Sequence, residues 1–136
     1  ALRGFATPDA AEAAFYEAFQ RRDLDAMMAV WADGDVACIH PMTIPLTGRG
    51  AVRAGWRSIF DAAGRFGIQV EMLARQQTGD VVIHYVKEYL TIGDEPAPRP
   101  PILATNVYRR ADDGWRIWLH HGSPVQAGEA RPNIVH

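Results

Sequence analysis

The chain has 136 residues, a formal net charge of −2 and 48% hydrophobic residues. This length is typical of one domain with its own core, and the small net charge excludes a general attraction for nucleic acid or anionic membranes. A single cysteine, Cys38, excludes an internal disulfide and a cysteine-based zinc site. The aliphatic run Val81-Val82-Ile83 is too short to span a membrane, so we expect a cytoplasmic protein without a signal peptide.

Three helices are predicted in the first half of the chain. Thr7-Pro8-Asp9 supplies a hydroxyl cap, a proline that needs no amide partner and an acid in the first turn. The apolar stripe of this helix leaves Glu12 outside and consists of Ala11, Phe15, Ala18 and Phe19. Asp23 caps a shorter helix over 24–31, and the apolar spacing predicts a third helix over 51–63.

Five strands are predicted around and after these helices. The first covers 36–40 and ends before Pro41, and the next two cover 68–77 and 81–92. The last two form a long hairpin within 102–123, because Asp113-Gly114 supplies the positive φ of a tight turn. Residues 94–101 form a proline-rich loop and residues from about 124 onward are irregular, so the whole chain, 1–136, is one domain.

Alternation along the hairpin assigns its side chains to two faces of the sheet. Trp118 and His120 share one face of the second strand, and Ile117 and His121 share the other. Both faces therefore carry large apolar groups, which indicates that helices cover one face and that a partner subunit or a loop covers the other.

The order helix, helix, strand, helix and four strands predicts an α+β fold with the helices on one face of an antiparallel sheet. With DLDAMMAVWADGDVACIHP early and TNVYRRADDGWRIWLHHGSP late, the chain resembles the nuclear transport factor 2-like (NTF2-like) superfamily, and within it the SnoaL-like proteins. The resemblance implies a cone, in which a strongly curved, mainly antiparallel sheet wraps about three N-terminal helices and encloses an apolar pocket for a small molecule. It also implies a homodimer through the outer face of the sheet.

Members of this superfamily include ketosteroid isomerase, polyketide cyclases, scytalone dehydratase, limonene epoxide hydrolase and non-catalytic association domains, so the fold alone does not choose a function. His40 precedes Pro41 where ketosteroid isomerase has its aspartate base, and an imidazole is a competent base near neutral pH. Asn106 matches the protonated acid of the same enzyme's oxyanion hole, where an amide also donates. The structural alternatives are a strand-ending histidine and a buried amide that satisfies neighbouring strands.

The catalytic tyrosine of ketosteroid isomerase matches Phe15, and Tyr16 lies about 100° further round the helix. The resemblance therefore implies that part of the oxyanion hole either is missing or is supplied elsewhere, by Tyr85 or Tyr108. Trp56, Trp118 and His120 are the other predicted pocket residues, with simple core packing as the alternative for the tryptophans.

We expect neither a metal nor a cofactor. His120 and His121 point to opposite faces of one strand and cannot bind one ion without distortion, and no other cluster has ligand spacing. Lys87 is interpreted as an edge-strand charge in water, with a desolvated nucleophile as its alternative.

Two functions remain open. The first is a cofactor-independent isomerase, dehydratase or cyclase that acts on a small apolar substrate, with His40 as base and Asn106 as donor. The second is a non-catalytic module that binds a ligand or assembles, as the likeness to the calcium/calmodulin-dependent kinase association domain allows.

Overall fold

The computed structural model describes residues 3–62, 64–94 and 99–125. The helices are α1 (Pro8–Arg21), α2 (Leu24–Val30) and α3 (Arg49–Ala62). The strands are β1 (Ala37–Ile39), β2 (Leu46–Thr47), β3 (Phe66–Thr78), β4 (Val81–Ile92), β5 (Ile102–Ala111) and β6 (Gly114–Pro124). They form one six-stranded sheet in the order β2-β1-β6-β5-β4-β3.

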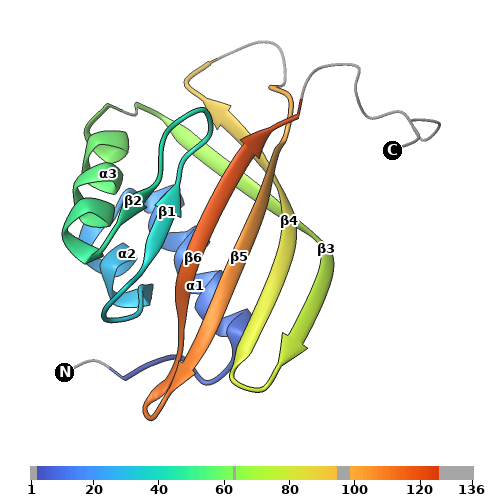
Figure 1. Ribbon diagram of the computed structural model, residues 1–136. Helices are drawn as coiled ribbons and strands as arrows, with labels where there is room; N and C mark the ends of the chain where they lie inside the picture. The colour runs from blue at the N-terminus through green and yellow to red at the C-terminus, as the bar shows by residue number, and fades with distance from the viewer. Residues whose placement is uncertain (1–2, 63, 95–98, 126–136) are drawn as a thin grey trace.

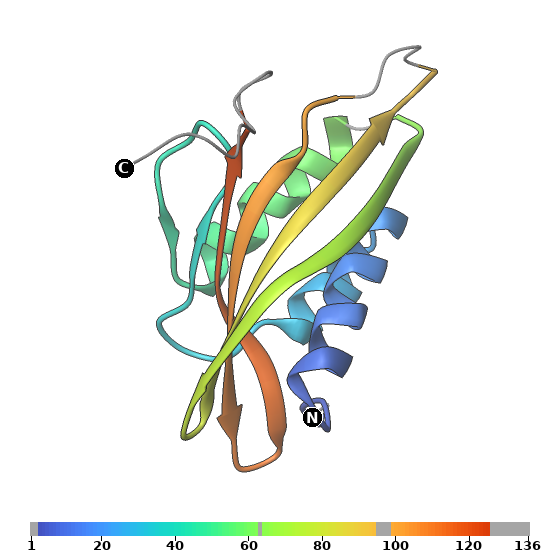
Figure 2. The ribbon, with the colours of Figure 1, turned by 90° about the vertical axis from the view of Figure 1, so that its right-hand side faces the viewer.

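The helices lie on one face of this sheet (Figure 1). Figure 2 shows that the long strands twist and bend along their length and that α1 runs beside them. All neighbouring strands are antiparallel except β1 and β6, which are parallel. The predicted α+β fold, with three helices on a curved and mainly antiparallel sheet, is therefore confirmed.

Side-chain caps begin the first two helices as predicted. The Thr7 hydroxyl accepts from the amide of Ala10 at 3.0 Å, and the Asp23 carboxylate accepts from the amide of Ala26 at 3.0 Å. The prediction that Glu12 lies outside the apolar stripe is wrong, because its side chain is buried against the sheet. Oε2 of Glu12 accepts from the Tyr108 hydroxyl at 2.7 Å and lies 2.8 Å from Nδ1 of His84.

Helix α3 begins two residues before the predicted start and is tied to the end of α2. The guanidinium of Arg49 donates to the carbonyl oxygens of Met28, Trp31 and Ala32 at 2.8 to 3.1 Å. These carbonyls belong to the last turn of α2 and to the residues after it, where a helix supplies few backbone donors. The contact fixes α3 against α2 at one end of the sheet.

A bulge in the hairpin changes which residues of β6 face the helices. Val107 pairs with Leu119 and Tyr108 pairs with Ile117, so Trp118 has no partner opposite it. Ile117 and His120 are consequently both buried on the helix side, although they are three residues apart. The prediction that Trp118 shares a face with His120 is wrong for this reason.

The tight turn of the hairpin lies one residue earlier than predicted. Asp112 and Asp113 form it, and Gly114 follows with a φ of 132° as the first residue of β6. A Cβ on Gly114 would lie 2.7 Å from the carbonyl oxygen of Phe5. Glycine is therefore required both by the backbone conformation and by the close approach of the N-terminal segment.

The core lies between the helices and the sheet and includes Trp31 and Trp115. Lys87 lies on β4, which is an inner strand, so its interpretation as an edge-strand charge is wrong. The opposite face of the sheet carries Leu103 and Tyr89, whose exposed fractions are 43% and 39%. Within the described ranges, every helix is too short or too polar to cross a membrane.

Candidate active site

A cavity of about 470 Å³ opens between the helices and the sheet. Its apolar walls are contributed by Phe19 of α1, Ile59 of α3, Phe66 of β3, Leu90 and Ile92 of β4, and Ile102 of β5. Four polar side chains also line it, namely His40, Thr43, Glu88 and His120. This combination of an apolar body and a few convergent titratable groups is typical of a small-molecule site.

Strand alternation explains why buried polar groups converge here. On β4 the residues Val82, His84, Val86 and Glu88 are buried while those between them are only partly covered. Asn106 is buried in the same way on β5, and the bulge in β6 brings His120 to the same side. Tyr16 reaches these strands from α1.

These residues form a continuous hydrogen-bonded chain, Glu88–Tyr16–Asn106–His120. The Tyr16 hydroxyl donates to Oε2 of Glu88 at 2.6 Å, and Nδ2 of Asn106 donates to the Tyr16 oxygen at 2.9 Å. Oδ1 of Asn106 then lies 2.6 Å from Nδ1 of His120. Because Oδ1 is an acceptor, Nδ1 of His120 must carry the proton, which leaves the Nε2 lone pair free.

Burial shifts the acidity of the groups that line the cavity. It raises the pKa of Glu88 from 4.5 to about 7, although the hydrogen bond from Tyr16 opposes this shift. Burial lowers the pKa of His120 to about 3, with further lowering by His40 and His121. Burial also lowers the pKa of His40, so both imidazoles are neutral near pH 7.

His40 lies where the sequence predicts, at the end of β1 and on the cavity wall. Its ring packs edge-on against Trp56, with 4.7 Å between centroids, and lies 6.4 Å from the ring of His120. Nε2 of His40 is 3.6 Å from the Cys38 sulfur, while Nδ1 has no hydrogen-bond partner among the described residues. Two neutral imidazoles thus flank the polar end of the cavity.

Asn106 is buried as predicted, but both ends of its amide are used within the protein. It lies behind the cavity wall and orients His120. Tyr16, the residue after Phe15 on α1, donates to Glu88 and accepts from Asn106, and neither Tyr85 nor Tyr108 is among the described residues that line the cavity.

The remaining predicted pocket residues lie elsewhere. Tyr85 is on the opposite face of β4, where its hydroxyl donates to Gln76 at 2.6 Å. Trp118 donates to Asp35 at 3.4 Å and stacks under the guanidinium of Arg109. Tyr108 is buried and donates to Glu12 at 2.7 Å, in a second polar cluster. The Trp56 ring packs against the ring of His40 but is not among the described residues that line the cavity.

The sequence-based reasoning missed Glu88, Tyr16, Glu12 and His84. A signal for Glu88 and His84 is present in VVIHYVKE, where they alternate with Val82 and Val86 on a strand. Charged residues in phase with buried valines indicate burial of the charges. Glu12 and Tyr16 lie one turn apart on α1 and so share a face.

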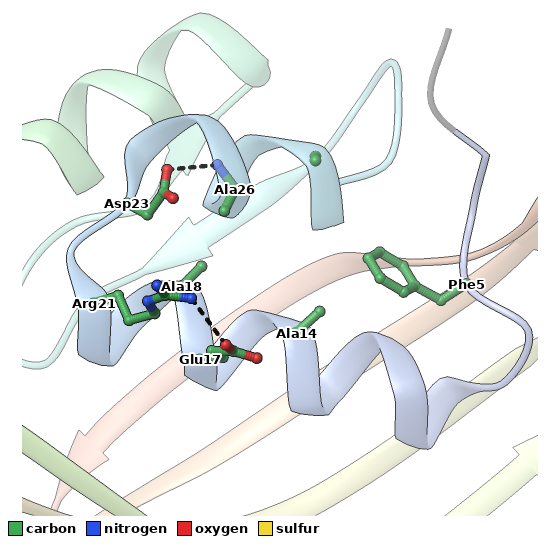
Figure 3. A pocket seen from close by; sticks show the side chains of 8 residues that line it. Phe5, Ala14, Glu17, Ala18, Arg21, Asp23 and Ala26 are labelled. Atoms are coloured by element: carbon green, nitrogen blue, oxygen red, sulfur yellow. Dashed lines mark hydrogen bonds and ion pairs between the residues drawn. The ribbon is translucent and has the colours of Figure 1, made fainter.

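A separate surface pocket of about 280 Å³ lies between α1 and α2, next to Phe5 (Figure 3). Half of its lining residues are alanines, and its charged groups are already engaged. Glu17 pairs with Arg21 at 3.2 Å, and Asp23 caps α2. Its described lining residues include no histidine, so it is a poorer candidate for chemistry than the cavity of Glu88.

No described group of three or more histidine, cysteine or acidic side chains has the geometry of a metal site. The lining residues of the Glu88 cavity include neither lysine nor arginine within the described part of the chain. Among the described residues the site therefore offers acid–base groups and apolar surface, and no lysine or arginine for a phosphate or a carboxylate.

Comparison with known proteins places these observations in context. The family model of the SnoaL-like domain matches residues 9–127. A structure from Thiobacillus denitrificans, provisionally described as a calcium/calmodulin-dependent protein kinase type II association domain, is 63% identical with a TM-score of 0.87. The match covers 92% of this chain and 100% of that one.

A second structure, provisionally described as a dehydratase of the NTF2-like family, comes from Streptomyces avermitilis. It is 31% identical with a TM-score of 0.77, over 86% of this chain and 93% of that one. A ketosteroid isomerase-like protein from Erwinia carotovora atroseptica is 21% identical with a TM-score of 0.69, over 87% and 93% of the two chains, and shares the fold. No significant match was found among curated proteins.

Proposed function

Because the chain belongs to the SnoaL-like family, we propose that it is an acid–base enzyme that removes water from a small, largely apolar substrate. The observation that carries this proposal is the pairing of a neutral imidazole, His40, with a buried carboxyl, Glu88, at one end of an apolar cavity. Groups whose acidities are shifted toward neutral pH suit proton transfer.

In the proposed reaction a neutral β-hydroxy ketone binds with its apolar body against Phe19 and Phe66. His40 removes the proton from the carbon next to the carbonyl, and the electron pair forms the new carbon–carbon double bond. Glu88 gives its proton to the departing hydroxyl, which leaves as water. One proton is taken and one is given, so the site ends with a cationic His40 and an ionised Glu88.

Tyr16 and Asn106 orient two side chains of the cavity wall, Glu88 and His120. Tyr16 holds Oε2 of Glu88, so Oε1 is the oxygen with no described partner and the one available to a ligand. Asn106 fixes the tautomer of His120, whose Nε2 accepts a hydrogen bond from the bound molecule. The absence of a described cationic side chain on the cavity wall favours a neutral substrate over an anionic one.

The Streptomyces relative supports dehydration over the other reactions of this fold, since its description names a dehydratase. The test is turnover of a panel of neutral β-hydroxy ketones, followed by the absorbance of the conjugated product. We expect turnover that is lost in both His40→Ala and Glu88→Gln. Thr43→Val, on the same wall, is the matched control. Activity that survives both substitutions excludes the proposed roles.

An assembly function is the second candidate, and the Thiobacillus relative favours it because its description names an association domain. We propose a homodimer through the sheet face that carries Leu103 and Tyr89. Light scattering tests it, with a dimer expected for the wild type and a monomer for Leu103→Glu. A wild-type monomer contradicts this proposal. An unchanged dimer in the variant contradicts this choice of face.

A further inference from the structure

Cys38 carries a buried thiol that the proposed reaction does not use. It lies on β1 with none of its surface exposed, two residues before His40. Residues two apart on an extended chain point to the same side, so the two side chains meet. The Cys38 sulfur is 3.6 Å from Nε2 of His40, which is within hydrogen-bond range for an atom as large as sulfur.

The Cys38–His40 pair is not a nucleophile with its base. Burial raises the pKa of the Cys38 thiol, and the neighbouring Glu88 raises it further, so the sulfur keeps its proton. Cys38 is also not among the described residues that line the main cavity. A thiol that is neither ionised nor accessible does not attack a bound molecule. Any effect of Cys38 on the site therefore passes through the imidazole of His40.

The Nε2 side of the His40 ring faces protein. A Cβ on Gly55 of α3 would lie 3.5 Å from Nε2 and 3.8 Å from Cδ2 of His40. The backbone of α3 thus lies beside this edge of the ring, and Cys38 lies at its nitrogen. Nδ1 lies across the ring from this edge and has no hydrogen-bond partner among the described residues. Because His40 lines the main cavity, Nδ1 is the nitrogen that a bound molecule can reach.

We propose that Cys38 is a positioning residue, whose sulfur accepts a hydrogen bond from Nε2–H of His40 so that the bare Nδ1 faces the cavity and takes the substrate proton. The proposal rests on the proposed function, in which His40 is the base. The opposite arrangement, in which the thiol donates to Nε2, puts the imidazole proton on Nδ1 and removes the basic nitrogen from the cavity. A thiol is a weak donor, whereas an N–H buried without an acceptor is costly. The contact therefore pairs the stronger of the two donors.

This arrangement specifies where the substrate proton goes. The bond between the substrate carbon and its hydrogen breaks, its electron pair becomes the new carbon–carbon double bond, and the proton binds to Nδ1 of His40. The imidazolium then has one N–H in the cavity and one on the Cys38 sulfur. Cys38 neither gains nor loses a proton. After the product leaves, Nδ1 returns its proton to water, and Nε2–H remains in place for the next turnover.

The experiment is nitrogen-15 NMR of the His40 ring at pH 7, because the shifts of the two ring nitrogens identify the tautomer. In the wild type we expect a proton on Nε2 and a bare Nδ1. Cys38→Ala removes the sulfur acceptor, so we expect the ratio of this tautomer to the other to fall several-fold. Val36→Ala is the matched control. Val36 is also buried and directly precedes β1, but its side chain offers no hydrogen bond.

Turnover gives a second measurement. Fewer molecules of Cys38→Ala hold the basic tautomer, so we expect kcat on a β-hydroxy ketone to fall several-fold with KM unchanged. In Val36→Ala we expect both constants to stay at their wild-type values. A purely structural role for Cys38 predicts instead that the two truncations have the same effect.

A proton on Nδ1 of His40 in the wild type overturns the proposal. A tautomer ratio in Cys38→Ala equal to those of the wild type and Val36→Ala overturns the role of Cys38. If Cys38→Ala does not fold, Cys38→Val fills the space without an acceptor and must shift the ratio in the same direction. The NMR measurement needs no substrate, so a failed tautomer assignment and a failed dehydratase assignment are distinguished.

Discussion

Nδ1 of His120 lies 2.6 Å from Oδ1 of Asn106, and this one contact decides which nitrogen of the imidazole is available to a ligand. The opposite end of the amide donates to Tyr16, so the amide cannot turn without losing a second buried hydrogen bond. Asn106 thus acts on the cavity through His120.

The tautomer of His120 is the first testable consequence. At pH 7 we expect nitrogen-15 NMR to find a proton on Nδ1 and a bare Nε2, because Asn106 can only accept at that position. Asn106→Asp places a carboxylate beside the ring and raises the pKa of His120 well above its wild-type value of about 3. A protonated Nε2 in the wild type contradicts the assignment.

Glu88 makes the folded state less stable as the pH rises. Between pH 4.5 and about 7 the folded protein keeps a proton on Glu88 that the unfolded chain has lost, so stability falls through this window. At 1.36 kcal/mol per pKa unit the loss approaches about 3 kcal/mol. In Glu88→Gln this pH-dependent loss of stability should be absent. Urea unfolding at pH 5 and pH 8 measures the change in the free energy of unfolding for the wild type and for Glu88→Gln. The same change in both proteins would contradict the raised pKa of Glu88.

His120 has the opposite dependence. Its pKa is lowered to about 3, so the unfolded chain gains a proton on acidification below pH 6.5 while the folded protein does not. Stability from this group is full above pH 6.5 and is lost as the pH falls toward 3. We expect His120→Gln to lose less stability than the wild type between pH 7 and pH 5. Stability is measured by urea unfolding at the two pH values. Equal losses of stability in the wild type and in His120→Gln would contradict the burial of the His120 ring.

Gly114 is predicted to be intolerant of a side chain. Gly114→Ala forces a φ of 132° on an L residue and places its Cβ 2.7 Å from the Phe5 carbonyl oxygen, so we expect a loss of roughly 1–3 kcal/mol. Gly50→Ala is the control, because α3 has open space there and alanine is the better helix former. Thermal unfolding ranks the variants, and equal melting temperatures disprove the constraint.

The alternation and capping rules predict much of the fold. The helix caps at Thr7 and Asp23, the bounds of β4 and the long hairpin follow from residues that are close in the chain. What they do not predict is the bulge at Trp118, because the extra residue is defined by pairing with another strand. That single residue moves His120 out of phase with Trp118.

The candidate site was predicted only in part for a related reason. His40 and Asn106 are recognisable from their neighbours in the sequence, but their partners are not. Glu88 and Tyr16 are separated by 72 positions, and Asn106 and Tyr16 by 90. A buried carboxylate or phenol is stable only with such distant partners, so the local pattern placed Glu12 outside the core and gave Glu88 no role.

The pH dependence of kcat/KM on a β-hydroxy ketone is the most direct test of the proposed chemistry. We predict a bell-shaped pH profile. Its acidic limb lies below the ordinary pKa of histidine, because the pKa of His40 is lowered. Its basic limb lies at about pH 7, because Glu88 loses its proton there. Glu88→Gln should remove the basic limb together with most of the rate. A flat profile, or a basic limb that persists in Glu88→Gln, would contradict the account.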